Sequence, residues 1–186
     1  MVYNVANVLT LSRLGMAVIF FLLIAFKSWV AVPVLLLAGV TDLLDGWVAR
    51  RYNQLTDFGR IADPVIDKVL ICSGFIFLVK HSDNIVTSWM AAVIVGRELV
   101  VTGLRSLAES RGRIFAATFW GKSKMVVQFV TLGYVIYLVA SDHTLGPQVL
   151  RTIGVVLVWV TLVVTVISGL VYLVNAEKLV RRQNAA

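Results

Sequence analysis

The chain has 186 residues, of which 59% are hydrophobic, and a formal net charge of +7. Soluble globular domains are about 45–50% apolar, so the composition indicates a protein that resides in a lipid bilayer. The lysines and arginines lie at the ends of apolar segments, which excludes a nucleic-acid-binding domain, and the single Cys72 excludes a disulfide or zinc framework.

Six apolar segments recur along the chain, and each can reach the roughly 20 residues of a membrane-spanning helix once its flanks are included. The apolar cores, in chain order, are Leu14–Phe26, Val30–Val40, Val69–Val79, Ile85–Val95, Met125–Ala140 and Val155–Val174. Polar motif residues, 59–68 and 96–108, complete the third and fourth helices. We therefore predict an all-α integral membrane protein with six transmembrane helices, forming a single domain over residues 1–186.

The distribution of basic residues predicts how these helices are oriented. Twelve fall at the N-terminus, in the second-to-third and fourth-to-fifth connections, or at the C-terminus: Arg13, Arg50, Arg51, Arg60, Arg105, Arg111, Arg113, Lys122, Lys124, Lys178, Arg181 and Arg182. The opposite side receives Lys27, Lys80 and Arg151, while Lys68 and Arg97 lie within helices. Cytoplasmic loops carry the excess of positive charge, so both termini are expected to be cytoplasmic.

Residues 42–67 read DLLDGWVARRYNQLTDFGRIADPVID and place four aspartates between apolar segments. The second helix is expected over Val32–Arg51, where i, i+3, i+4, i+7 spacing puts four positions on one face: Asp42, Asp45, Gly46 and Ala49. The third helix is expected over Gly59–Lys80, where i, i+4, i+8 spacing puts three positions on one face: Gly59, Asp63 and Asp67. The short connection makes the helices antiparallel, so the four carboxylates are predicted to form one cluster near the cytoplasmic surface.

Four neighbouring carboxylates repel one another and need compensating positive charge. The nearby cations, Arg50, Arg60 and Lys68, are not spaced to supply four pairs. Oxygen ligands without His or Cys favour Mg²⁺, Mn²⁺ or Ca²⁺ over zinc, and two divalent ions balance four charges. From the residues alone, two alternatives stay open: solvated or helix-capping aspartates, and a proton or cation pathway in a transporter.

Written as spacing, the same stretch is D-x2-D-G-x2-A-R-x8-G-x3-D-x3-D. It resembles, at all eight fixed positions, the signature of the CDP-alcohol phosphatidyltransferases. The resemblance implies a six-helix membrane enzyme, typically a homodimer, with its active site open to the cytoplasm. Such enzymes use two divalent cations, Mg²⁺ or Mn²⁺, to transfer a phosphatidyl or related phosphoryl group from a CDP-linked donor to an alcohol, with release of CMP.

Three further stretches resemble the bacterial phosphatidylglycerophosphate synthases of this family: NVLTLSR at 7–13, GRELVVTGLR at 96–105 and WGKSKMVVQ at 120–128. Met125 departs from the threonine expected there. This resemblance implies CDP-diacylglycerol as donor and sn-glycerol 3-phosphate as acceptor. It also implies a location in the bacterial cytoplasmic (inner) membrane, where membrane lipids surround the protein. The alternatives are another acceptor (inositol phosphate, serine or phosphatidylglycerol) and, from a different class, a divalent-cation or proton-coupled transporter.

The family pattern also implies roles for individual residues. Four aspartates are expected to bind metal, and Asp67 also to act as general base: Asp42, Asp45, Asp63 and Asp67. The donor nucleotide is expected to contact seven positions: Asn7, Thr10, Gly46, Ala49, Arg50, Thr56 and Gly59. Asn7 and Thr10 have helix N-capping as an equal alternative.

A glycerol 3-phosphate acceptor requires cations for its dianionic phosphate. The candidates are basic residues of the fourth and fifth helices and their connection: Arg97, Arg105, Arg113, Lys122 and Lys124. Arg97 and Arg105 are eight residues apart and can share a helix face, whereas Arg113 has an alternative role as a lipid-headgroup anchor. Glu98, in the same apolar helix, is expected to pair with an arginine.

Overall fold

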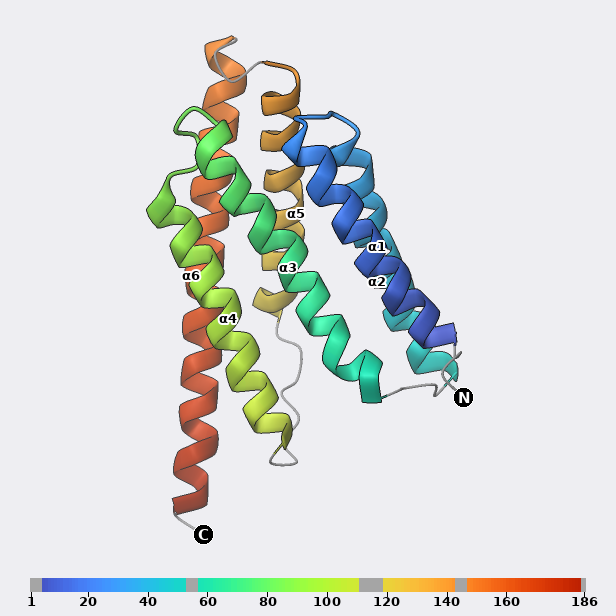
Figure 1. Ribbon diagram of the computed structural model, residues 1–186. Coiled ribbons are helices and arrows are strands. Elements are labelled where there is room, and N and C mark those ends of the chain that lie inside the picture. The colour runs from blue at the N-terminus through green and yellow to red at the C-terminus, as the bar shows by residue number, and fades with distance from the viewer. Residues whose placement is uncertain (1–4, 53–56, 111–118, 143–146, 185–186) are drawn as a thin grey trace.

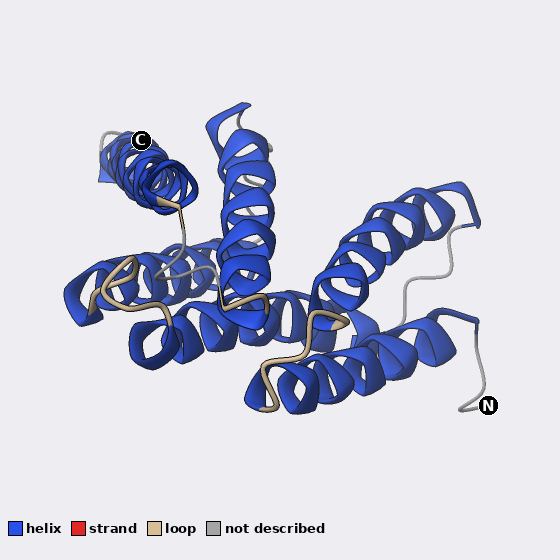
Figure 2. Cartoon of the chain, turned by 90° about the horizontal axis from the view of Figure 1, so that it is seen from above, coloured by secondary structure: helices blue, strands red, loops and turns tan. Residues whose placement is uncertain are grey.

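A computed structural model describes the backbone of residues 5–52, 57–110, 119–142 and 147–184. Side chains are described for residues 15–41, 68–106, 108, 121, 123–142 and 147–174. Within these ranges the regular elements are all helices, as Figure 2 shows, in agreement with the predicted all-α class.

Six helices follow one another along the described backbone. They are α1 (Val5–Ala25), α2 (Ala31–Tyr52), α3 (Asp57–His81), α4 (Ser88–Ser110), α5 (Phe119–Ala140) and α6 (Gln148–Asn184). The predicted bounds of the second and third helices are confirmed to within one and two residues respectively. The last helix is much longer than its predicted apolar core, because it begins directly after Pro147 and continues well beyond Val174.

The helices pack side by side as an up-and-down bundle (Figure 1). α1 packs against α2 and α3, α4 packs against α3 and α6, and α5 packs against α2, α3 and α6. α1 begins and α6 ends at the lower end in Figure 1, where α2 also ends and α3 begins. The segments that carry the four aspartates therefore lie at the same end of the bundle as the two termini.

The apolar core fills the space between all six helices. Its most deeply buried side chains come from every helix and are almost inaccessible to solvent: Phe20, Ile24, Leu35, Phe75, Leu78, Ile94, Leu132, Leu138 and Val158. α5 has a large share of buried residues, which follows from its contacts with three neighbouring helices.

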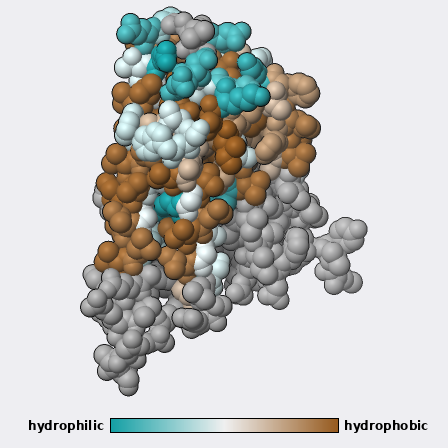
Figure 3. All heavy atoms as spheres, turned by 60° about the vertical axis from the view of Figure 1, so that its left-hand side comes forward, coloured by the Kyte–Doolittle hydropathy of each residue, from teal (hydrophilic) through white to brown (hydrophobic). Residues whose placement is uncertain are grey.

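The outward faces are apolar as well. Figure 3 shows a broad hydrophobic belt over α4 and α6, with hydrophilic side chains gathered at the end where α3 and α4 are connected. Within the described residues, two segments are long and apolar enough to cross a membrane, Ser123–Ala140 and Gln148–Val174, while Gly15–Ala25 and Ala31–Thr41 are shorter apolar segments. Because every backbone polar group must be satisfied inside lipid, continuous helices with apolar surfaces suit that solvent.

The fourth helix begins later than its apolar core predicts. Ile85 and Val86 are fully buried but precede α4. The reason is the connection itself: Asp83 and Asn84 adopt the left-handed conformation with φ of 47° and 64°, and the Ser82 hydroxyl accepts a hydrogen bond of 3.0 Å from the Val86 N–H. Both residue types tolerate positive φ, so the chain turns here before the helix starts.

Gly74 of α3 packs directly against Leu132 of α5, and it yields a stability prediction. A Cβ at this position would lie 2.7 and 2.8 Å from the two methyl groups of Leu132, which is fully buried. Gly74→Ala is therefore expected to cost about 1–3 kcal/mol of unfolding free energy through overpacking. Thermal unfolding in detergent measures this loss. The matched control is Gly15→Ala, because nothing lies within 4 Å of a Cβ there; equal melting temperatures for the two variants would contradict the prediction.

Candidate active site

The positions of the four aspartates are helical, as predicted. Asp42 and Asp45 lie in the last three turns of α2, and Asp63 and Asp67 lie in the first three turns of α3. The helical spacing from which the acidic cluster was inferred is thus confirmed for the backbone. The side chains at these positions lie outside the described set, so the cluster itself remains a prediction.

The other predicted site residues, those expected to bind the two substrates, lie mostly in helices. Within helices are Asn7 and Thr10 (α1), Gly46, Ala49 and Arg50 (α2), Gly59 (α3), Arg97 and Arg105 (α4), and Lys122 and Lys124 (α5). Thr56 and Arg113 lie outside the described residues. Among these helical positions, side chains are described for Arg97, Arg105 and Lys124. No group of three metal-binding side chains occurs among the described ones, a set that does not include the four aspartates.

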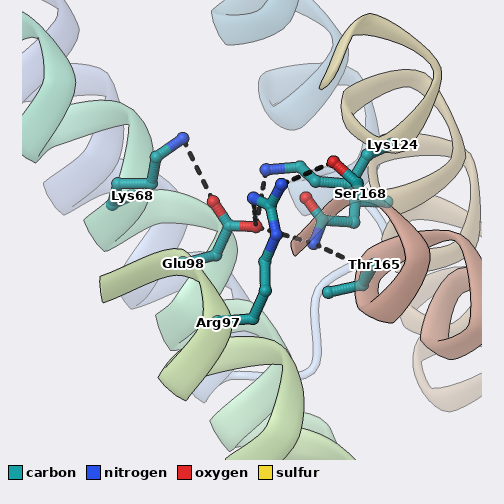
Figure 4. Close-up of polar contacts among 7 residues, drawn as sticks. Lys68, Arg97, Glu98, Lys124, Thr165 and Ser168 are labelled. Atoms are coloured by element: carbon teal, nitrogen blue, oxygen red, sulfur yellow. Dashed lines mark hydrogen bonds and ion pairs between the residues drawn. The ribbon is translucent and has the colours of Figure 1, made fainter. Parts of the chain in front are cut away.

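The described part of the site is built around a buried carboxylate, Glu98 of α4. Its side chain is 1% exposed and takes part in ion pairs with three cations. Oε1 lies 2.5 Å from the Lys124 Nζ and 3.1 Å from the Arg97 Nη1. Oε2 lies 3.2 Å from the Lys68 Nζ, an ion pair without hydrogen-bond geometry. Glu98 thus joins α3, α4 and α5 at one point (Figure 4).

Gln128 of α5 completes this group of residues. Its Nε2 donates to the same Glu98 Oε1 at 3.2 Å and to the Thr165 Oγ1 of α6 at 3.4 Å. We call Glu98, Lys68, Arg97, Lys124 and Gln128 the Glu98 cluster. Because Gln128 and Arg97 both reach α6, the cluster contacts four helices of the bundle.

Arg97 is held between Glu98 and α6. Its Nη1 donates to Glu98 and its Nη2 donates to the Ser168 Oγ at 2.5 Å. The guanidinium also lies 5.9 Å from the centre of the Tyr172 ring, within the range of a cation–π contact. Two hydrogen bonds at different nitrogens fix the plane of the guanidinium as well as its position.

The cluster corrects one prediction and confirms another. Lys124 was counted with the helix-end cations, but its side chain is 6% exposed and points into the bundle, because Glu98 provides it with a partner there. The predicted pairing of Glu98 with an arginine is confirmed by Arg97, and Glu98 also pairs with two lysines. Arg105 is exposed on α4, and its predicted sharing of a pocket with Arg97 remains a prediction.

A row of hydrogen-bonded polar side chains between α5 and α6 was not predicted. The Thr131 and Thr161 hydroxyls are 2.7 Å apart, and Thr131 Oγ1 also donates to the Leu157 carbonyl at 3.3 Å. With the cluster, the row comprises positions at i, i+4, i+7 on each helix: Lys124, Gln128 and Thr131 on α5, and Thr161, Thr165 and Ser168 on α6. That repeated spacing of polar residues in two apolar helices is the sequence signal that could have found it.

Cations outnumber carboxylates among the described side chains of the cluster. Three of them, Lys68, Arg97 and Lys124, pair with the single carboxylate of Glu98. Exposed fractions of 24%, 10% and 6% show that these cations are largely withdrawn from water. Such an excess of partly buried donors suits a dianionic group such as a phosphate.

Comparison with known protein families identifies the family to which the chain belongs. The sequence model of the CDP-alcohol phosphatidyltransferase family matches residues 3–167. The chain belongs to this family. The match includes α1 to α5 and most of α6, so every predicted site residue of this phosphatidyltransferase falls within it.

Curated relatives of this family member share nearly its whole length. Proteins named CDP-diacylglycerol–glycerol-3-phosphate 3-phosphatidyltransferase from Shigella flexneri serotype 5b and Salmonella choleraesuis are 32% and 33% identical, each over 95% of this chain and 97% of its own length. The Bacillus subtilis protein of the same name is 32% identical over 91% of this chain and 93% of its own.

The Glu98 cluster predicts a large stability effect. Glu98→Gln removes the carboxylate that pairs with buried Lys124 and with the partly buried Arg97 and Lys68, and breaking a buried pair by removal of one partner costs about 3–5 kcal/mol. The double variant Glu98→Gln/Lys124→Met removes one of the stranded cations as well, so a smaller loss is expected. Denaturant unfolding in detergent measures both. The single variant Lys124→Met completes the comparison. The interpretation fails if the loss of unfolding free energy in the double variant equals the sum of the losses in the two single variants.

Proposed function

We propose that this protein transfers the phosphatidyl group of CDP-diacylglycerol to sn-glycerol 3-phosphate, giving phosphatidylglycerophosphate and CMP. The observation that carries the proposal is the similarity over 95% of the chain to relatives named for this reaction. Family membership also favours an enzyme over the transporter alternative. The products belong to phosphatidylglycerol and cardiolipin biosynthesis.

The charge of the Glu98 cluster supports a phosphorylated acceptor. Arg97 and Lys124 are among the residues predicted to bind glycerol 3-phosphate, and both lie in the cluster, whose described side chains include three cations and one carboxylate. Charge-assisted hydrogen bonds from such cations favour a phosphate group over a neutral or zwitterionic alcohol such as serine. Of the alternative acceptors, inositol phosphate also has a dianionic phosphate monoester, whereas phosphatidylglycerol has a singly charged phosphodiester. The relatives' names favour glycerol 3-phosphate over both.

Four residues of α2 and α3 suit a pair of divalent cations, which we propose to be Mg²⁺ or Mn²⁺. Asp42, Asp45, Asp63 and Asp67 supply only oxygen ligands, which hard cations prefer. Helical backbone at all four positions agrees with that proposal, since each pair then repeats on one face of its helix. When bound, such ions withdraw charge from the diphosphate of the donor and stabilise the departing CMP.

Proton transfer and substrate binding are assigned to individual residues of the protein. We assign to Asp67 the role of general base, which takes the proton of the attacking glycerol hydroxyl as the new P–O bond forms and the bond to CMP breaks. Arg97 and Lys124 hold the phosphate of the acceptor, with Arg105, Arg113 and Lys122 as further candidates. The donor nucleotide is assigned to seven residues: Asn7, Thr10, Gly46, Ala49, Arg50, Thr56 and Gly59.

The bundle supports a specific orientation in the membrane. We propose six spanning helices in a single domain, residues 1–186, with both termini and the active site on the cytoplasmic side of a bacterial inner membrane. Lys27 lies between α1 and α2, Lys80 in the last turn of α3, and Arg151 in the first turn of α6, all away from the aspartate end. This leaves the basic majority at the end with the termini, as positive-inside orientation requires. A homodimer is proposed from the family resemblance.

The reaction can be tested directly with purified protein. CDP-diacylglycerol and Mg²⁺ or Mn²⁺ are supplied with glycerol 3-phosphate, inositol phosphate, serine or phosphatidylglycerol in turn, and CMP release is measured. We expect release with glycerol 3-phosphate alone. Release with a different acceptor would move the protein to another branch of the family, and no release with any of them would refute the proposal.

The role of Asp67 gives a separate prediction. Asp67→Asn keeps an oxygen ligand but loses the base, so turnover should fall by at least about 10²-fold while much of the metal and nucleotide binding persists. Calorimetric titration with Mn²⁺ and with CDP measures the binding. The matched control is Asp83→Asn, an exposed aspartate in the α3–α4 connection, which should retain parent activity. Equal losses of binding and turnover would show that Asp67 serves only as a ligand.

A further inference from the structure

Arg97 of α4 makes contacts with α6 that were not predicted from the sequence. Its side chain is 10% exposed, and its contacts across the bundle are with the segment of α6 around Ser168. The Ser168 hydroxyl is itself fully buried and accepts the Nη2 donor at 2.5 Å. Figure 4 shows the guanidinium lying between the Glu98 carboxylate on one side and Ser168 on the other.

The neighbouring residue, Gly169, makes room for the stem of Arg97. A Cβ at position 169 would lie 3.1 Å from the Arg97 Cγ and 3.7 Å from its Nε. A larger side chain would therefore move the arginine, since the glycine is buried and the two helices pack against each other. Tyr172, one turn further along, places its ring 5.9 Å from the guanidinium carbon.

One donor of Arg97 is not used by the described residues. The Nε is buried, and within the described part of the chain it has no hydrogen-bond partner. Buried donors of charged groups are normally satisfied. The guanidinium is thus fixed at both Nη atoms, by Glu98 and by Ser168, while the stem with its Nε packs beside Gly169.

We propose that Ser168 and Gly169 are positioning residues that set the guanidinium of Arg97 for the acceptor's phosphate. This inference rests on the proposed function, because it takes the phosphate of glycerol 3-phosphate as the group that Arg97 binds. Both residues lie just beyond the stretch, 3–167, that the family model matches. They form no part of the predicted site, and they act on the substrate only through Arg97.

The physical reason is the shape of arginine. Its planar fork binds an anion well only in the correct plane, and a free arginine side chain has many rotamers. Glu98 alone holds one Nη atom and leaves the plane free to turn about that contact. The Ser168 hydroxyl supplies the second fixed point, and Gly169 allows the stem to reach it.

A double-mutant cycle tests this dependence. Four proteins are compared, namely the parent, Ser168→Ala, Arg97→Lys and the double variant, and kcat and KM for glycerol 3-phosphate are measured by CMP release. Ser168→Ala should raise the acceptor KM by about tenfold, the usual scale of a lost hydrogen bond to a charged group, and change the KM for CDP-diacylglycerol by less than about twofold. In the Arg97→Lys background, where the fork is already gone, the same change should cost less than about twofold.

Thr161→Val provides the matched control. Thr161 is another buried hydroxyl of α6, on the same face as Ser168, but it is hydrogen-bonded to Thr131 and not to Arg97. Its removal should leave the acceptor KM unchanged. Gly169→Val is the second probe, and it should raise the acceptor KM by displacing the stem of Arg97, whose Cγ lies 3.1 Å from the position of a Cβ.

The outcomes separate this inference from the proposed reaction. A parent protein that releases no CMP with glycerol 3-phosphate would overturn both. An active parent in which Ser168→Ala costs the same factor with and without Arg97, or in which Thr161→Val raises the acceptor KM equally, would overturn only the positioning role. In that case the hydroxyl would merely stabilise the bundle.

Discussion

The structure depends on one buried carboxylate. Glu98 is 1% exposed in the middle of an apolar bundle, and transfer of an isolated carboxylate to such a place is prohibitively costly. It is tolerated because Lys68, Arg97 and Lys124 surround it, each from a different position on α3, α4 or α5. Since buried ion pairs seldom add net stability, their value here lies in fixing how three helices are placed relative to one another.

The two ends of the bundle are held together by different kinds of contact. At the end where α1 joins α2 and α3 joins α4, the helices are held by large apolar side chains such as Phe20, Phe75 and Leu138. Toward the end that carries the aspartates, polar contacts take over, from the Thr131–Thr161 pair to Arg97 and Ser168. Directional hydrogen bonds fix side-chain orientation in a way that apolar packing does not, and a site for phosphoryl transfer depends on such positioning.

Much of this architecture could be predicted from sequence, because it follows from periodicity. Apolar cores gave the helices, and the bounds of α2 and α3 were confirmed closely. The start of α4 was wrong, since Ile85 and Val86 are apolar for core packing while Asp83 and Asn84 turn the chain. Hydrophobicity reports burial and does not distinguish a buried turn from a buried helix.

The aspartate positions of the site could be predicted from the sequence, whereas most of the Glu98 cluster could not. A spacing of eight fixed residues predicted the acidic positions, because they follow one another within 26 residues of chain. The Glu98 cluster joins residues 68, 97, 98, 124 and 128, and its contact with Ser168 spans 71 positions. Such pairings depend on which helices are neighbours, and a single sequence does not specify that. Glu98 could therefore be assigned an arginine partner but not its two lysines.

The exposed fractions of the three cations of the Glu98 cluster differ from helix to helix. They fall from 24% for Lys68 to 10% for Arg97 and 6% for Lys124. The most accessible cation is thus the one on α3, and it follows Asp67 directly in the chain. A single helix turn therefore carries both the proposed base and the outermost charge of the basic cluster. Neighbouring positions on a helix do not share a face, so the pairing of Lys68 with Glu98 of α4 leaves position 67 on a different part of the α3 surface.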